Sequence, residues 1–279
     1  MAVRVYYSTK HINLGDAINP FLLRKLFGID LKLVKYRNAE LFPIGSILGK
    51  ITSSRGNLWR RIKGRFQTPA TIWTSGFLTP PDSNDVVCRK LQICALRGKK
   101  SQECLEKLLG KKIDVPLGDG GLLMPQLLKE RPDKTIPLGI VPNYKEIDSS
   151  QIKQLLEKFP QAELISPEIF GSENIEERLL EIIRKIASCE AVLSSSLHGI
   201  IVADGFGIPC RHLLGADIDG GLFKFEDYRS AFGLKNEPVM LNDLLSGAVS
   251  LPELFRHAQL SPDHVAEVAA RISSAFPKF

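Results

Sequence analysis

Apolar and polar positions along this chain follow a pattern typical of strands that alternate with helices. The pattern is clearest in the second half: strand 136–141, helix 150–159, strand 162–165, a helix capped by Asn174, strand 191–194, helix 200–206 and strand 210–214. Strands that alternate with helices form parallel sheets with helices on both faces. We therefore predict an α/β fold.

The first half of the chain shows the same pattern in shorter runs. We predict strands at 3–7, 31–35, 43–48, 71–75, 91–96 and 113–117, and helices that start near Asn19, Ser101 and Pro125. Pro20 would then occupy the first helical turn, where its missing N–H costs nothing. Residues 129–135 are polar and broken by proline, so we expect two Rossmann-like α/β domains, 1–130 and 131–279, the second including the C-terminal helices. Parallel sheets with facing carboxyl ends would form a cleft between them.

The stretch 191–210 carries the strongest chemical signal. Its predicted strand, tight turn and short helix place Ser194, Ser195, Ser196, His198 and Gly199 together at a strand end. A helix N-terminus offers unpaired N–H groups and a positive dipole end, which suit a phosphate or carboxylate. His198 adds a side chain that titrates near neutrality. We predict an anion site in which His198 is the acid or base; a purely structural histidine is the alternative.

Two further polar residues follow predicted strands in the first half. Arg97 precedes a predicted helix, where a guanidinium can hold a carboxylate or phosphate with two parallel bonds. An ordinary ion pair is the alternative. Asp16 lies in a polar turn, where it either faces the cleft or caps local backbone.

The composition argues against a membrane-spanning, disulfide-rich or metal-binding protein. Of the 279 residues, 44% are hydrophobic and 24% charged, and no apolar run approaches the roughly 20 residues that a membrane span needs. The N-terminus reads as a first strand rather than a signal peptide, so we expect a cytoplasmic protein. The five cysteines include no CxxC pair, and we predict neither a disulfide framework nor a metal site.

The net charge of +6 is concentrated in one segment, which we call the basic segment, residues 50–66. No acidic residue lies between Glu40 and Asp82. The basic segment contains Trp59, Phe66 and the cations Lys50, Arg55, Arg60, Arg61, Lys63 and Arg65. An anionic membrane surface suits this mixture, and nucleic acid or a solvated loop are the alternatives. Our prediction is peripheral association with the inner face of the membrane, and no nucleic-acid partner.

Several short motifs, in this order and spacing, resemble the polysaccharide pyruvyl transferase family over roughly residues 3 to 230. They are GDAINP at 15–20, GSIL at 45–48, SG at 75–76, LRG at 96–98 with Ser101, Asp119, Pro142 with Tyr144, SSSLHG at 194–199, GIP at 207–209 and DYR at 227–229.

The resemblance implies a fold like the GT-B glycosyltransferases and transfer of pyruvate from phosphoenolpyruvate to two hydroxyls of a sugar. The product is a pyruvate ketal, typically on an oligosaccharide, free or lipid-linked, destined for an exopolysaccharide or cell-surface polymer. No cofactor is implied, since phosphoenolpyruvate is the donor substrate. The first domain would face the acceptor, and the 194–199 element of the second would bind the donor.

The resemblance also implies roles for individual residues. His198 would be catalytic, Arg97 would bind the donor, and Ser194 and Ser195 would donate to its phosphate. Asp16 and Asn19 would shape the cleft or contact the acceptor. The remaining substrate-binding positions are Ser196, Gly199, Asp119 and Asn143.

Two positions depart from the family pattern. Many members carry Arg at the position of Ser196 and His at the position of Asn143. The first departure removes a cation that would hold the donor, for which Lys99, Lys100, Arg211 or Lys224 could substitute. Two alternatives stay open. One is a GT-B glycosyltransferase that uses a nucleotide-sugar, because a strand, glycine turn and helix followed by GIP also suit a nucleotide diphosphate. The other, which Ser196 favours, is a non-catalytic, membrane-associated member of a polysaccharide assembly complex.

Overall fold

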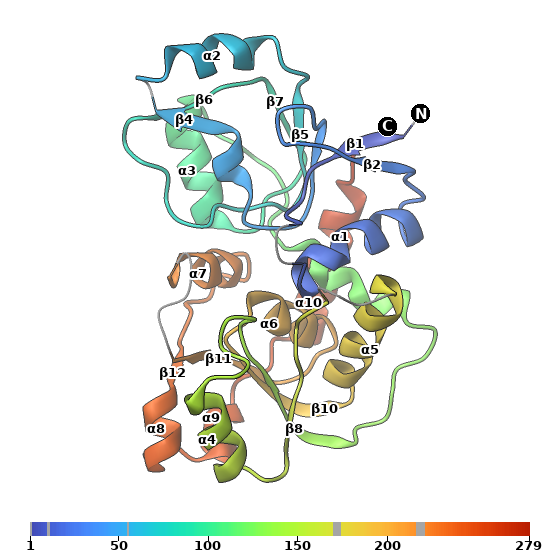
Figure 1. The fold of residues 1–279 in the computed structure, drawn as a ribbon, viewed down its shortest axis with the longest axis vertical. Helices are drawn as coiled ribbons and strands as arrows, with labels where there is room; N and C mark the ends of the chain where they lie inside the picture. The colour runs from blue at the N-terminus through green and yellow to red at the C-terminus, as the bar shows by residue number, and fades with distance from the viewer. Residues whose placement is uncertain (1, 10–11, 55, 170–173, 216–220) are drawn as a thin grey trace.

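Two parallel five-stranded sheets, stacked along the long axis of the molecule, form the frame of the protein (Figure 1). The computed structural model describes residues 2–9, 12–54, 56–169, 174–215 and 221–279. Helices follow the strands in both halves of the chain. The predicted α/β class with parallel sheets is confirmed.

The first sheet, drawn in blue to green at the top of Figure 1, has the strand order β2-β1-β3-β5-β7. An antiparallel pair, β4 with β6, lies beside it. The elements of this half are β1 (Val3–Val5), α1 (Leu14–Lys25), β2 (Leu31–Leu33), β3 (Leu41–Phe42), η1 (Leu48–Lys50), β4 (Thr52–Ser54), α2 (Leu58–Arg65), β5 (Ala70–Ile72), β6 (Asp85–Val87), β7 (Leu91–Ile93), α3 (Lys99–Leu109) and η2 (Gly120–Leu127), where η marks a 3-10 helix.

The second sheet has the order β12-β11-β10-β8-β9, with β10 at its centre. Ser194, the last residue of β10, lies opposite Val141 of β8 and His212 of β11. The elements are β8 (Ile136–Val141), α4 (Ser150–Lys158), β9 (Ala162–Leu164), α5 (Ile175–Ala187), β10 (Cys189–Ser194), α6 (Leu197–Gly205), β11 (Cys210–Leu214), α7 (Phe223–Ser230), β12 (Val239–Met240), α8 (Leu241–Ser246), α9 (Leu251–Phe255) and α10 (Pro262–Ser274).

The prediction for the start of the first helix is wrong. α1 begins at Leu14 because the Asn13 side chain accepts from the N–H of Gly15, so the expected polar turn is the first helical turn. Pro20 lies inside the helix and cannot donate to Asp16 O, to which Asn19 Nδ2 donates instead at 3.4 Å. Asn19 also exchanges two hydrogen bonds with the backbone of Ile44, so its side chain compensates for the proline and ties α1 to the first sheet.

Other predictions in the first half fail where the chain is irregular. Residues 43–48 and 113–117 touch the sheet only through isolated bridges at Gly45 and Leu117. The helix expected from Pro125 is the end of η2. The helix expected from Ser101 is α3, which begins at Lys99; the N–H and hydroxyl of Ser101 both donate to Asp227. The basic segment, for which one reading was a loop, contains helix α2.

One hydrophobic cluster joins the two sheets. It includes Leu22 and Trp73 from the first half and Val192 and Ile272 from the second. The indole N–H of Trp73 donates to Ile272 O at 2.8 Å, and the ring of Phe276 stacks on Phe27 at 3.8 Å between centroids. The end of α10 therefore packs against the first half of the chain and helps to fix the two sheets relative to each other. The boundary near residue 130 remains a prediction.

Candidate functional site

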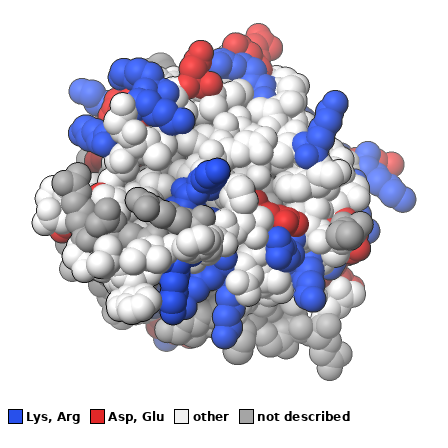
Figure 2. Space-filling view, turned by 90° about the horizontal axis from the view of Figure 1, so that it is seen from above, with Lys and Arg blue, Asp and Glu red and all other residues white. Residues whose placement is uncertain are grey.

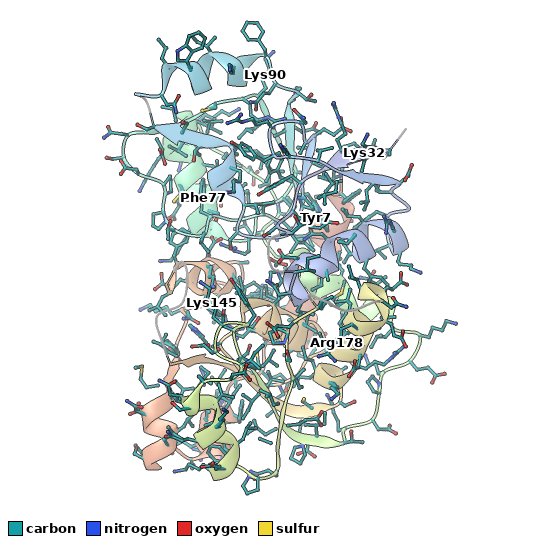
Figure 3. The ribbon with its side chains drawn as sticks, in the orientation of Figure 1. Tyr7, Lys32, Phe77, Lys90, Lys145 and Arg178 are labelled. Carbon is teal, nitrogen blue, oxygen red and sulfur yellow. The ribbon has the colours of Figure 1, made fainter. Side chains whose placement is uncertain are left out.

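A cleft of about 430 Å³ lies where the two halves of the chain meet. It is bordered by residues that follow the carboxyl ends of strands in both sheets, the edge at which parallel α/β proteins bind ligands. In Figure 3, Tyr7 and Phe77 of the upper half and Lys145 of the lower half lie near this junction. The lining includes Ser8, Asn13, Gly15, Asp16, residues 45–47, residues 143–145, residues 196–198 and Lys224.

His198 is part of this lining. It is the second residue of α6, which begins at Leu197, three residues earlier than we predicted. The Nδ1–Cε1 edge of its ring lies against Gly15: a Cβ on Gly15 would come within 2.1 Å of Nδ1. The glycine in α1 is therefore needed for the close approach of the imidazole.

Asp119 lies behind the imidazole. Its Oδ1 is 4.0 Å from Nε2 of His198 and accepts from the N–H of Gly121 at 2.9 Å, which caps η2. Nε2 of His198 and Oδ2 of Asp119 are buried, and neither has a hydrogen-bond partner among the described residues. The predicted direct contact of Asp119 with substrate stays untested; the geometry places this carboxyl beside the imidazole instead.

Burial shifts the pKa values of both His198 and Asp119 away from their ordinary values. Desolvation, with Arg97 and Lys224 nearby, lowers the pKa of His198 to about 3. Desolvation also raises the pKa of Asp119 to about 6, against the hydrogen bond from Gly121. With these pKa values the imidazole is neutral at neutral pH and the Asp119 carboxyl is mostly ionised. A bound anion would favour the charged imidazole.

The N-terminus of α6 opens into the cleft. Ser196 is its N-cap residue but makes no side-chain cap hydrogen bond. The Ser196 N–H itself is bound by Ser194 Oγ at 3.0 Å. The N–H groups of residues 197–199 precede the first intrahelical bond, which Ile200 makes to Ser196 O. Such donors and the positive end of the helix dipole are features that suit an anion.

Lysine supplies the positive charge of the cleft. Lys224, in the first turn of α7, is largely buried, and its charge contributes to the low pKa of His198. Lys145 also lines the cleft. Of the other candidates for the missing arginine, Lys100 pairs with Glu226 at 2.6 Å and Arg211 donates to Leu254 O at 2.9 Å, both outside the lining. Lys99 is also outside the lining.

The wall formed by α1 contributes Asp16. This carboxyl lies opposite the second-sheet residues, and burial raises its pKa to about 7, against a hydrogen bond from Asn13. Asn143 lines the other wall, and its Oδ1 accepts from the N–H of Lys145 at 3.1 Å. The structure thus brings together four of the predicted site residues in the cleft lining: Asp16, Asn143, Ser196 and His198.

Arg97 lies outside the cleft lining and has no exposed side-chain surface. It binds Asp227 through Nε and Nη2, each at 2.9 Å, and also donates to Ser46 Oγ and to Phe77 O. Each of the three guanidinium nitrogens therefore has a partner within the protein, and the side chain connects the first sheet to α7. The predicted contact of Arg97 with the donor stays untested; the contacts that Arg97 makes here are with other residues of the protein.

The remaining predicted residues also make contacts within the protein. Ser194 Oγ donates to Val141 O at 2.7 Å and lies at the turn before α6. Ser195 donates to Glu146 and accepts from the N–H of Asn143 at 2.8 Å, so it anchors the 143–145 loop. Gly199 lets α6 approach β8, because a Cβ there would meet Val141 Cγ1 at 2.8 Å.

Sequence reasoning missed Lys145 and the pairing of Asp119 with His198. Lys145 had a local signal, since it follows the polar end of strand β8 two residues after Asn143. The pairing of residues 119 and 198 had no local signal, because 79 positions separate them. Within the described residues, no cluster of three His, Cys, Asp or Glu side chains could hold a metal ion.

Comparison with known proteins supports the resemblance drawn from the motifs. The family model for polysaccharide pyruvyl transferase matches residues 85–215, which include Asp119 and His198. An uncharacterized protein of Acanthamoeba polyphaga mimivirus is 26% identical over 239 residues, covering 84% of this chain and 76% of its own. A solved structure of an uncharacterized protein from Klebsiella pneumoniae is similar with a TM-score of 0.47 and 13% identity, covering 86% of this chain and 92% of that chain.

Proposed function

We propose that this chain, whose residues 85–215 match the polysaccharide pyruvyl transferase family, transfers pyruvate from phosphoenolpyruvate to two hydroxyls of a sugar. In this reaction the two hydroxyl oxygens form bonds to C2 of the donor, and the bond from C2 to the phosphate oxygen breaks. One proton is added to the methylene carbon, and inorganic phosphate leaves with the other. The sugar gains a cyclic ketal.

The observation that carries the proposal is the meeting of the α6 N-terminus, Lys224 and His198 in one cleft. Phosphoenolpyruvate carries its carboxylate and its phosphate on the same carbon, C2. The open N–H groups of α6 suit one anionic group, and a lysine suits the other. In this proposal Lys224 takes the place of the arginine that many family members carry at position 196.

His198 is the proton donor in the proposed mechanism. Donor binding puts negative charge beside an imidazole whose pKa is low, and this charge raises the pKa. Asp119, 4.0 Å behind the ring, stabilises the imidazolium through the same effect. Protonation of the methylene carbon leaves positive charge on C2, to which the first hydroxyl adds. General acid catalysis of this kind contributes about 10²- to 10⁴-fold.

The acceptor lies against the first half of the chain in this proposal. Asp16 faces the cleft there, and a carboxyl with a pKa of about 7 can accept a proton from a sugar hydroxyl near neutral pH. A GT-B-like arrangement, with the first domain toward an oligosaccharide acceptor and the second toward the donor, follows from the same assignment. The proposal requires no cofactor and no metal.

Ligand-dependent stability tests the donor. A ligand that binds only the native state raises its melting temperature, so the protein is unfolded with phosphoenolpyruvate, UDP, GDP or CMP added separately. We expect a shift with phosphoenolpyruvate alone. A shift with a nucleotide alone would contradict the proposal in favour of glycosyl transfer.

Turnover is then measured as phosphate release in the presence of sugar acceptors. His198→Ala is expected to lower it by at least 10²-fold while the protein stays folded. A variant with a near-normal rate would remove His198 from the mechanism. Donor binding without turnover on any acceptor would favour the non-catalytic alternative. For the glycosyltransferase alternative, Asp204 is a poor donor-sugar ligand, because it is buried against Tyr228 and Arg229.

A further inference from the structure

Helix α2 presents large apolar side chains to solvent. Leu58 is 60% exposed, Trp59 75%, Ile62 41% and Phe66, directly after the helix, 86%. These four lie within nine consecutive residues, whereas the other exposed large hydrophobics of the described chain are scattered. Isolated exposed apolar residues are common on soluble proteins, but a group of this kind marks an interaction surface.

The four side chains share one face of the helix. At about 100° per residue, positions 58, 59, 62 and 66 fall within roughly a third of the helical circumference. Gly64 lies on the opposite side and is buried: a Cβ there would come within 2.0 Å of Cys88 O. The glycine therefore lets α2 lie directly on the backbone that follows β6, and this contact turns the apolar face outward.

Positive charge borders this apolar face. The chain contains no Asp or Glu from residue 41 to residue 81. Lys63 is exposed, with Nζ 6.0 Å from the centroid of the Trp59 ring. Arg61 and Arg65 occupy helix positions on the other border of the apolar face; their side chains and those of Arg60, and all of Arg55, lie outside the described residues.

α2 lies at the end of the molecule away from the cleft. Figure 1 shows it at the top, beyond β4 and β6, while α6 and α7 lie below the first sheet. Figure 2 views the molecule from this end, where Lys and Arg surround a broad area of uncharged residues and acidic residues cover little. Lys90 lies at the same end in Figure 3 and is exposed. A partner bound at this end leaves the cleft accessible.

We infer that the apolar face of α2 inserts into the interfacial region of an anionic lipid bilayer. Tryptophan, phenylalanine and leucine on one face with lysine and arginine at its borders are typical of helices that lie in the plane of a membrane. The absence of acidic residues from 41 to 81 favours a negatively charged surface. The inference does not depend on the proposed reaction.

Tryptophan fluorescence provides a direct test on the full chain. The protein has two tryptophans; Trp73 is fully buried, so the lipid-dependent change reports Trp59. We expect a blue shift with vesicles of phosphatidylcholine and phosphatidylglycerol, little change with pure phosphatidylcholine, and loss of the shift at high salt. No shift with the anionic vesicles at low salt would overturn the inference, as would an equal shift with both vesicles or a shift produced only by nucleic acid.

Substitutions test which side chains are responsible, by sedimentation with the same vesicles. Leu58→Ser with Phe66→Ser is expected to weaken binding at least tenfold, and Arg61→Ser with Lys63→Ser by about fivefold for each cation removed. The matched control is Leu33→Ser with Phe279→Ser, which replaces two exposed hydrophobics outside α2. Because all replaced apolar groups are exposed, the variants should stay folded. Unchanged binding by both α2 variants, or an equal loss in the control, would contradict the inference.

Discussion

Oδ1 of Asp119 lies 4.0 Å from Nε2 of His198, while the opposite Nδ1–Cε1 edge of the same ring lies against Gly15 of the cleft wall. Apo distances of this length often shorten when substrate binds. The imidazole thus lies between a buried carboxyl and the backbone of Gly15, and both His198 and Gly15 line the cleft. In the proposed mechanism, therefore, Asp119 is a positioning residue that acts through His198.

Asp119→Asn tests this relationship. Asparagine keeps the cap on the Gly121 N–H but removes the charge that stabilises an imidazolium. We expect turnover to fall by about tenfold to a hundredfold, and the alkaline limb of its pH profile to move down by about one unit or more. Asp114→Asn, at an exposed site, is the control. An alkaline limb that does not move would reduce Asp119 to a structural cap.

Lys224→Met tests the cation of the cleft. If Lys224 holds an anionic group of the donor, its loss should raise the KM for phosphoenolpyruvate by roughly ten- to a hundredfold, as expected for one hydrogen bond to a charged group. Lys100→Met removes a lysine that pairs with Glu226 outside the cleft and should leave KM unchanged. Equal effects of the two substitutions on KM would show that the overall positive charge, and not a contact of Lys224 with the donor, is responsible.

Asp16→Asn should stabilise the protein at alkaline pH. Burial raises the folded-state pKa of Asp16 to about 7, above the value of about 3.9 in an unfolded chain. The folded state then holds the proton more tightly than the unfolded chain does. The stabilisation that protonated Asp16 contributes is therefore fully present below about pH 4 and is lost as the pH rises through about 7. The variant escapes this loss. We expect it to be more stable by about 1 to 3 kcal/mol at pH 8 and unchanged at pH 4.

Chemical denaturation at the two pH values measures this difference. Asp133→Asn, which replaces an exposed carboxyl, serves as the control. A variant of Asp16 with the same stability difference from the native protein at both pH values would show that the carboxyl is ionised without penalty. The same variant should lower turnover if Asp16 accepts a proton from the acceptor.

Arg97→Met separates a structural role from donor binding. Removal of one partner from a fully buried ion pair costs about 3 to 5 kcal/mol, since the remaining charge stays desolvated. We therefore expect a large loss of unfolding free energy, partly recovered in the double variant with Asp227→Leu. The folded double variant should still bind phosphoenolpyruvate. If it is stable but has lost donor binding, Arg97 contacts the donor after all.

The sequence by itself determined the class of fold and the strand end at which the candidate site lies. Alternation of strands and helices predicted parallel sheets, and the cap Asn174 marked the start of α5 because its side chain binds a backbone N–H only three residues away. The position of His198 after a buried strand placed it at the carboxyl edge of the sheet. Each of these signals depends on interactions between neighbours in sequence.

Only the tertiary structure decided which side chains meet. Arg97 and Asp227 lie 130 positions apart, and their pairing withdraws from the cleft a guanidinium that local pattern had placed there. Four cations were candidates to replace the missing arginine, and only the fold shows that Lys224 is the one of the four that lines the cleft. Periodicity indicates which face of an element is buried, but not which other element covers it. Burial by residues distant in sequence is also the main cause of the pKa shifts of Asp16, Asp119 and His198.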